Sequence, residues 1–142
     1  MTDIAIAQPS DAELDVIHAA LAETYWSPGI PRDIVERGFR NSMVVLARDE
    51  NGALIGWARL VTDRATFAWL CDVLVLPEYQ GRGIARALVR AFRAHAELQN
   101  LRRWILGTRD AHGVYAALGF QSVAAPERLM EIRNPVPYGI PV

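Results

Sequence analysis

The chain has 142 residues, 51% of them hydrophobic, and fifteen basic and sixteen acidic residues give it a formal net charge of −1 at pH 7. This length predicts a single domain over residues 1–142, large enough to bury roughly two thirds of its unfolded surface. The near-zero net charge excludes a global field that would draw the protein onto nucleic acid or an anionic membrane, so any anion must bind at a local patch.

Cys71 is the only cysteine, which excludes a disulfide within the chain and a zinc site built from several thiolates. No uninterrupted apolar run approaches the ~20 residues needed to cross a bilayer. Residues 1–5 lack the basic start and the apolar core of a signal peptide. We therefore expect a cytoplasmic protein that binds no membrane and no metal.

The first 40 residues predict a short strand followed by two helices. Residues 4–7 are an apolar strand candidate, and Ser10-Asp11-Ala12-Glu13 matches a capping box, in which the Ser10 hydroxyl and the Glu13 carboxylate satisfy backbone donors at a helix start. The helix should end near Glu23, where the sequence Thr-Tyr-Trp-Ser-Pro-Gly breaks the apolar pattern. Pro31 suits the first turn of a second helix.

The middle of the chain predicts three strands joined by tight turns. Residues 42–47 are rich in β-branched side chains, residues 49–52 (Asp-Glu-Asn-Gly) are a turn signature, and residues 53–61 resume an extended pattern. After a second turn, residues 66–75 predict a strand that we expect to be central, because its apolar content is nearly continuous. Pro77 ends this strand.

The remaining chain alternates helices and strands. The predicted segments are, in order, a helix over residues 82–97, a strand over 103–106, a helix over 110–118 that Gly119 stops, strands over 120–123 and 128–132, and a proline-containing tail over 134–142. This order predicts an α/β (α+β) domain whose central sheet is mixed, mostly antiparallel and flanked by helices.

The strand that ends at Pro77 leads into a glycine-rich turn, Gln80-Gly81-Arg82-Gly83-Ile84-Ala85, which opens a helix. The two glycines can adopt backbone angles closed to other residues, so that amide N–H groups converge where the helix dipole favours an anion. A Rossmann fingerprint fails because its third glycine position is Arg86, and no Gly-Lys-Ser/Thr follows to make a P-loop. The alternative is a tight strand-to-helix connection that binds nothing.

This turn resembles the signature Gln/Arg-x-x-Gly-x-Gly/Ala of the GNAT superfamily of acetyl-CoA-dependent N-acetyltransferases, and the predicted order of elements is similar to the GNAT fold over residues 4–133. The resemblance implies that the turn amides bind the pyrophosphate of coenzyme A and that the pantetheine arm lies along the preceding strand like an added strand. The cofactor-binding residues that it implies are Val73, Leu74, Val75, Gln80, Gly81, Arg82, Gly83, Ile84, Ala85 and Arg86.

Acetyl transfer to an amine requires a base that takes a proton from the ammonium group and an acid that returns one to the departing thiolate. The segment Val114-Tyr115-Ala116-Ala117-Leu118-Gly119-Phe120 resembles the family's Leu-Tyr-x-x-x-Gly-Phe, which implies that Tyr115 is the general acid. The alternative is that Tyr115 is a half-buried aromatic residue of a short helix.

The base is not evident, because residues 103–108, where many GNAT enzymes carry a glutamate, contain no carboxylate. The candidates are Asp72, His112 and Glu23. Asp72 interrupts an apolar strand, so it is a base or a buried structural carboxylate. His112 precedes Tyr115 by one helical turn, and it is a proton relay, a contact to coenzyme A or a surface histidine.

The loop over residues 24–31 lies where GNAT proteins usually shape the acceptor site, and Tyr25 and Trp26 either line that site or pack the loop onto the domain. We expect direct transfer of acetyl from acetyl-CoA to a primary amine of a small molecule or peptide. Cys71 has no evident activating partner, so we favour a core residue over an acyl-carrying nucleophile.

Two other functions compete with acetyl transfer. A noncatalytic acyl-CoA-binding regulatory module of the same fold would keep the turn without turnover. Nucleic-acid binding through the arginines of the helix over residues 82–97 is disfavoured, because the chain has neither excess positive charge nor a recognition fold. The sequence leaves the oligomeric state open between a monomer and a homodimer.

Overall fold

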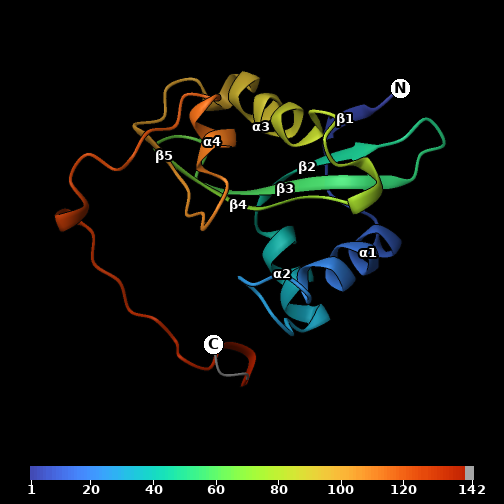
Figure 1. Cartoon of the computed structure of the whole chain (residues 1–142), viewed down its shortest axis with the longest axis horizontal. Coiled ribbons are helices and arrows are strands. Elements are labelled where there is room, and N and C mark those ends of the chain that lie inside the picture. The colour runs from blue at the N-terminus through green and yellow to red at the C-terminus, as the bar shows by residue number, and fades with distance from the viewer. Residues whose placement is uncertain (140–142) are drawn as a thin grey trace.

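A computed structural model describes residues 1–139 of the protein, and its core is one five-stranded sheet in the order β1-β2-β3-β4-β5 (Figure 1). The strands are β1 (Asp3–Ile6), β2 (Met43–Arg48), β3 (Leu54–Thr62), β4 (Phe67–Val75) and β5 (Arg103–Ile105). The pairs from β1 to β4 are antiparallel, and β5 runs parallel to β4. The predicted mixed, mostly antiparallel sheet is confirmed.

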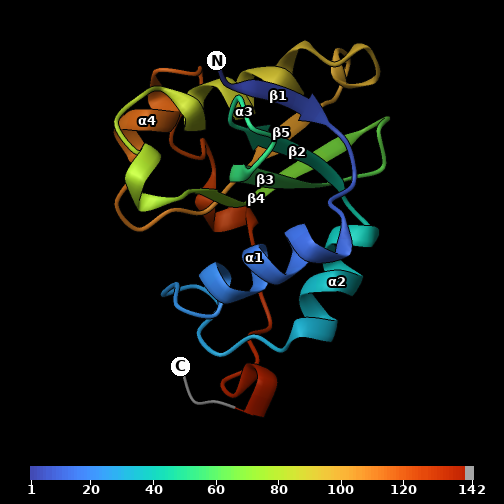
Figure 2. The same ribbon diagram turned by 90° about the vertical axis from the view of Figure 1, so that its right-hand side faces the viewer.

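Helices cover both faces of this sheet. They are α1 (Asp11–Leu21), α2 (Arg32–Arg40), α3 (Ile84–Ala94) and α4 (His112–Ala116). Figures 1 and 2 show α1 and α2 on one side of the sheet and α3 and α4 on the other. The predicted capping box opens α1, since Ser10 Oγ accepts from the Glu13 amide at 3.1 Å and the Glu13 carboxylate accepts from the Ser10 amide at 3.0 Å.

Each face of the sheet has its own hydrophobic core. Along β2, Val45 and Ala47 pack toward α3, while Val44 and Leu46 pack toward α1 and α2. All four side chains are buried. This two-sided burial explains why the strand sequences are nearly continuous in apolar residues rather than alternating.

A β-bulge interrupts β4 at Asp72. Arg59 of β3 pairs with Cys71 and Trp57 pairs with Leu74, so β4 has one residue more than β3 between these two pairs. Asp72 takes a positive φ of 51°, an angle uncommon for residues other than glycine, asparagine and aspartate. The extra residue bends the strand and redirects the side chains that follow it.

β4 and β5 diverge soon after they meet. β5 pairs with β4 only from Phe67 to Trp69, so within residues 1–139 the outer edge of β4 from Leu70 to Val75 has no strand beside it. The sequence predicts β4 as central, whereas it is the last strand but one, with part of its outer edge open. Continuous apolar content reports burial on both faces, which does not require a strand on each side.

The C-terminal region differs most from the predicted fold. The strands predicted over residues 120–123 and 128–132 are absent, and a short 3₁₀ turn spans Pro126–Arg128. The reason is that strand propensity forms a strand only where a neighbouring strand accepts the backbone hydrogen bonds. Residues 129–139, which we call the C-terminal arm, instead leave the body of the domain (Figures 1 and 2). The last three residues of the predicted tail lie outside the described residues.

The helix predicted over residues 82–97 also ends earlier than expected, since α3 stops at Ala94. His95 is extended at its C-cap, and a 3₁₀ turn follows over Ala96–Leu98. The apolar periodicity of the sequence continues through Leu98. This side chain is buried, because the 3₁₀ turn still directs it into the core under α3. Periodicity alone therefore overestimates the length of the helix.

Candidate active site

The predicted strand, turn and helix form one unit at the start of α3. Gly81 and Gly83 have φ angles of 78° and 77°, and Gly83 is the N-cap of α3 with no side-chain cap. Among residues 1–139, the backbone amides of residues 81–86 donate to no protein acceptor. The first turn of α3 contains no acidic residue. Free amides and the positive end of a helix dipole together favour an anion at this position.

Two side chains hold the glycine turn in place. Gln80 Nε2 donates to the carbonyl of Val75 at 3.0 Å, and the guanidinium of Arg82 lies 5.2 Å from the ring centroid of Tyr79. A Cβ atom built on Gly81 or Gly83 would meet nothing within 4 Å. The space beside both glycines is therefore open.

A cavity of about 480 Å³ lies where β4 and β5 diverge. Residues 69–73 of β4 line one side and residues 106–108 line the other. Val73, Leu74 and Val75, the predicted pantetheine-binding residues, connect this cavity to the glycine turn along the open edge of β4. One continuous edge thus joins the glycine turn to a cavity. We call it the acceptor cavity, after the role predicted for the loop over residues 24–31, which lines part of it.

Aromatic side chains from four parts of the chain surround the acceptor cavity, and one of them is Tyr138 of the C-terminal arm. Tyr25, Trp26 and Trp69 line it and are 44–45% exposed, unlike Trp57, which is fully buried in the core. Tyr115 lines it from α4. Large aromatic faces that remain accessible around one cavity are typical of a site for an organic ligand, and they attract cations.

Asp72 contributes a carboxylate to the acceptor cavity, but both of its oxygens are engaged. Arg59 Nε donates to Oδ2 at 2.8 Å, and Trp26 Nε1 donates to Oδ1 at 2.9 Å. Arg59 also donates to Ser42 Oγ at 3.1 Å. This geometry favours a structural carboxylate over a base, because a proton taken up on either oxygen would compete with a hydrogen bond or an ion pair that the fold already makes.

The sequence analysis gives two alternative roles for Tyr25 and Trp26, lining the acceptor site or packing their loop onto the domain. In the structure these two side chains do both. The Tyr25 hydroxyl accepts from the backbone amide of Arg109 at 3.1 Å, and the Arg109 guanidinium lies 3.8 Å from the Tyr25 ring centroid. Sequence reasoning does not find Arg59 or Arg109. The only sequence signal for Arg59 is that an arginine interrupts the apolar strand β3. Its pairing with Asp72 depends on the bulge in β4 and cannot be read from the sequence.

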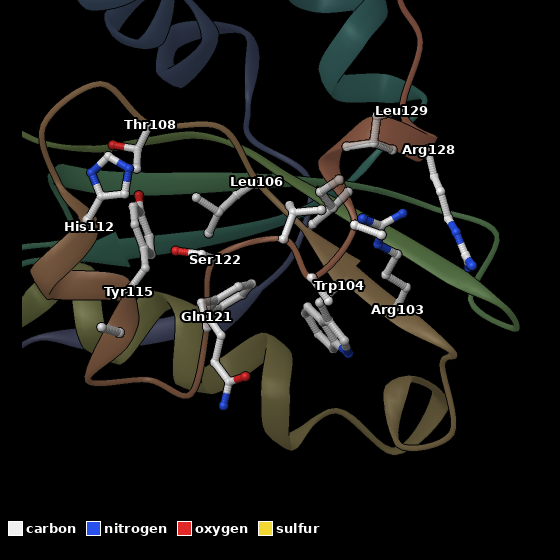
Figure 3. A pocket seen from close by; sticks show the side chains of 16 residues that line it. Arg103, Trp104, Leu106, Thr108, His112, Tyr115, Gln121, Ser122, Arg128 and Leu129 are labelled. Atoms are coloured by element: carbon white, nitrogen blue, oxygen red, sulfur yellow. The ribbon is translucent and has the colours of Figure 1, made fainter.

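Tyr115 stands between the acceptor cavity and a second cavity, which Figure 3 shows. Its ring packs edge-on against Phe120 with centroids 6.0 Å apart. Burial raises the pKa of Tyr115, and the neighbouring Tyr25 raises it further. The hydroxyl therefore keeps its proton at neutral pH, as a proton donor must.

The other predicted proton carriers lie in different surroundings. His112 lines the second cavity, where Figure 3 shows its ring near Thr108 and the hydroxyl end of Tyr115. Glu23 is exposed and does not line the acceptor cavity. Asp110, which sequence reasoning does not propose, lines that cavity beside Asp72.

Cys71 lines the acceptor cavity as well, but its chemistry is unsuited to nucleophilic attack. Burial raises the pKa of its thiol to about 11, so almost no thiolate forms at neutral pH. Within residues 1–139, no three His, Cys, Asp or Glu side chains gather in a way that could hold a metal ion. No helix in the same part of the chain has the length and apolar character that crossing a membrane requires.

Comparisons with known proteins agree with this geometry. Residues 13–120 match a family model described as the acetyltransferase (GNAT) family. A crystal structure of a GNAT-family protein from Xanthomonas campestris pv. campestris is 39% identical, with a TM-score of 0.86 and 94% of each chain covered. A protein named as an acetyltransferase in Gibberella zeae is 29% identical over 122 residues, which are 72% of this chain and 69% of that protein. A Staphylococcus aureus structure with 21% identity and a TM-score of 0.74, covering 94% of this chain and all of that one, shares the fold.

Proposed function

Because the chain belongs to the GNAT family of acetyltransferases, we propose that it transfers the acetyl group of acetyl-CoA to the nitrogen of a primary amine. The observation that carries the proposal is the continuous open edge of β4, which joins the glycine turn to a cavity containing Tyr115. A long ligand with a diphosphate at one end and a thioester at the other suits such an edge.

The chain's own residues would hold acetyl-CoA in two ways. The free amides of residues 81–86 would bind the diphosphate, with Arg82 and Arg86 adding positive charge at the start of α3. The open backbone of Val73, Leu74 and Val75 would pair with the amide groups of the pantetheine arm, as it would with an added strand. When bound, acetyl-CoA supplies a thioester carbon that a neutral amine can attack.

The transfer forms a C–N bond and breaks the C–S bond, and Tyr115 would donate its phenolic proton to the departing sulfur. The amine nitrogen loses a proton in the same reaction. Asp110 also lines the acceptor cavity, and its one side-chain partner among residues 1–139 is Arg109, at 3.5 Å from Oδ2, whereas both oxygens of Asp72 are engaged at 2.8–2.9 Å. We propose that Asp110 receives this proton directly or through water. Cys71 carries no acyl group in this scheme, since its raised pKa keeps the thiol protonated.

The acceptor cavity favours an amine with an apolar body. The faces of Tyr25, Trp26 and Trp69 attract an ammonium group and cover apolar surface at the same time. Small-molecule amines and peptide amines both meet this description. We propose that the acceptor is a primary amine of one of these two kinds.

The experiment that tests this function measures release of free coenzyme A thiol from acetyl-CoA with a panel of aryl-alkyl amines, linear alkyl diamines and peptides. The expected result is amine-dependent release, fastest with amines that carry an aromatic or aliphatic body. A parallel binding measurement follows coenzyme A by calorimetry. Tight coenzyme A binding with no turnover for any amine would instead support the noncatalytic acyl-CoA-binding module. If the protein neither binds coenzyme A nor releases thiol with any amine, both the acetyltransferase and the binding module are rejected.

A further inference from the structure

Positive charge is concentrated on α3 and on the turn before it. Residues 79–96 contain four arginines and no acidic residue. These arginines are Arg82, Arg86, Arg90 and Arg93, and all four are exposed. Among residues 1–139, none of them takes part in an ion pair. Because the whole chain carries a formal net charge of −1, this is a local positive patch on a chain that is otherwise acidic on balance.

Three of the four arginines share one side of α3. Arg86, Arg90 and Arg93 are spaced by four residues and then by three, so their side chains lie above one another on the helix. Leu88 is fully buried on the opposite side, where α3 packs on the sheet (Figure 1). At about 1.5 Å per residue, the three positions span roughly 10 Å along the helix. We call these three residues, together with Arg82 in the turn, the arginine face.

The arginine face begins at the end of the proposed site that holds the acetyl donor. Arg86 lies in the first turn of α3, next to the free amides of residues 81–86. Within residues 1–139, the acceptor cavity takes no lining residue from α3. A molecule bound to the arginine face therefore leaves the cavity open to the acceptor. Its position favours contact with whatever delivers the acyl group.

Coenzyme A by itself leaves much of this face unused. Its diphosphate would bind at the glycine turn, and the rest of the molecule carries one further phosphate, on the ribose of its adenosine. One phosphate pairs with one or two neighbouring arginines, whereas the arginine face continues for roughly 10 Å along the helix. Unpaired arginines gathered over this length complement a partner surface that carries several carboxylates.

We propose that the arginine face docks an acidic carrier protein that bears the acyl group on a phosphopantetheine arm, so that this protein serves as a donor in place of acetyl-CoA. The inference rests on the proposed acetyl transfer. The arm has the same pantetheine and thioester as acetyl-CoA, and its single phosphate joins it to a serine of the carrier. With the arm along β4 and this phosphate at the glycine turn, the serine lies just outside the turn and the carrier faces α3.

The chemistry of the transfer is the same with either donor. The C–S bond of the thioester breaks, a C–N bond to the amine forms, and the thiol of the arm leaves with the proton from Tyr115. The arginine face adds only electrostatic attraction, which raises the rate of encounter and holds the carrier in one orientation. Binding of the carrier should therefore weaken steeply as the salt concentration rises.

The first experiment measures binding of a purified acyl carrier protein, with its phosphopantetheine arm attached, by calorimetry at low salt. The expected result is a dissociation constant in the micromolar range. The variant Arg90→Glu/Arg93→Glu should weaken binding by at least about 10-fold, because it reverses two charges in the interface. Arg93 also stacks on Trp104 at 4.9 Å, so Arg90→Glu alone is the second variant if the double variant unfolds.

The control Arg37→Glu/Arg133→Glu makes the same change in net charge at two exposed arginines outside the arginine face. It should bind the carrier as wild type does. No binding to wild type, or equal binding to the double variant and the control, would overturn the proposal. Equally strong binding of a mixed-sequence RNA that the double variant also loses would assign the face to polyanions in general, and would overturn it too.

The second experiment measures thiol release from the acetyl-loaded carrier protein and from acetyl-CoA with the same amines. Both donors should support transfer. The variant Arg90→Glu/Arg93→Glu should raise the KM for the carrier at least about 10-fold while the KM for acetyl-CoA stays unchanged. An equal rise for both donors would mean that the face binds the ribose phosphate of coenzyme A, and would overturn the proposal. Turnover with acetyl-CoA alone would reject the carrier and keep the proposed function, whereas turnover with neither donor would reject the proposed function itself.

Discussion

At the scale of single residues, Tyr115 is the side chain whose surroundings most favour one chemical role. Burial keeps its pKa above the usual value of about 10, so the hydroxyl keeps its proton throughout the neutral range. Tyr115→Phe removes this proton and leaves the ring against Phe120. We expect kcat to fall about 100-fold, the lower end of what a general acid contributes, while the dissociation constant of coenzyme A stays unchanged.

Steady-state thiol release and calorimetry measure the two quantities. Tyr79→Phe is the matched control, because it deletes a tyrosine hydroxyl outside the acceptor cavity and keeps the ring on which Arg82 stacks. A kcat for Tyr115→Phe within a factor of two of the control would assign Tyr115 to packing alone.

Asp72 leads to a prediction about stability rather than turnover. Its side chain is 12% exposed, and its partner Arg59 is 22% exposed. Asp72→Asn leaves the arginine partly buried without a countercharge, so the free energy of unfolding should fall by about 2 kcal/mol. Urea unfolding measures this loss. Asp110→Asn is the control, since its ion pair with Arg109 is exposed on both sides and should contribute much less.

The activity of the same variant separates a structural role from a base. If Asp72 is structural, the pH dependence of kcat/KM keeps its shape in Asp72→Asn, although the activity itself can fall. If the acidic limb of the profile disappears in this variant and persists in Asp110→Asn, then Asp72 is the base and the structural interpretation is wrong.

At the scale of the elements, the start of α1 is joined to β2 through one carboxylate. Glu13 completes the capping box and pairs with Arg48 at 2.7 Å. Arg48 lowers the pKa of Glu13, and the Ser10 backbone lowers it further. A lowered pKa in the folded state stabilises the protein above the unfolded pKa of about 4.5, and this contribution is lost as the pH falls through the folded value.

Glu13→Gln should therefore lower the free energy of unfolding by about 1 kcal/mol at pH 7, and the difference from wild type should shrink below pH 4. Chemical unfolding at the two pH values measures it. Glu36→Gln is the control, because its ion pair with Arg32 is longer, at 3.4 Å, and more exposed. A pH-independent difference for Glu13→Gln would mean that packing, and not the charge, stabilises this junction.

The start of α3 allows a matched pair of glycine variants. Gly83 and Gly52 have φ angles of 77° and 83°, and a Cβ on either meets nothing within 4 Å. Gly83→Ala and Gly52→Ala should therefore each cost about 1 kcal/mol of stability from backbone strain alone. Only Gly83→Ala should weaken coenzyme A binding, since a methyl group and a shifted turn would disturb the free amides.

Equilibrium unfolding and calorimetry on both variants check this pair. Gly83→Asp extends the series, because it adds a negative charge beside a diphosphate and should weaken binding more than the alanine. Unchanged coenzyme A affinity in a folded Gly83→Asp protein would place the diphosphate elsewhere.

At the scale of the whole molecule, the sequence predicts local features better than distant ones. The capping box at Ser10 and the glycine turn before α3 are readable because their partners lie within a few residues. The bulge at Asp72 and the contact of Tyr25 with Arg109 depend on segments far apart in the chain. The C-terminal region shows the same limit, since residues 128–132 alternate as a strand does and yet pair with no strand among residues 1–139.

Binding of coenzyme A should stabilise the whole molecule, because the proposed site draws on β4, the glycine turn and α3 together. A ligand at 100 times its dissociation constant adds about 2.7 kcal/mol to the folded state. For a chain of this length, that corresponds to a rise in the midpoint of thermal unfolding of roughly 10 °C. Differential scanning calorimetry with increasing coenzyme A measures the rise, which should grow with the logarithm of ligand concentration.

Two comparisons decide whether this stabilisation comes from the proposed site. Gly83→Asp should show little rise at the same ligand concentration, whereas Gly52→Ala should respond as wild type does although its own midpoint is lower. Pantetheine, which lacks the diphosphate, should raise the midpoint less than coenzyme A, because it can pair with β4 but leaves the amides of residues 81–86 unfilled. Equal rises for pantetheine and coenzyme A would mean that the glycine turn contributes nothing to binding, and the strand edge alone would then hold the ligand.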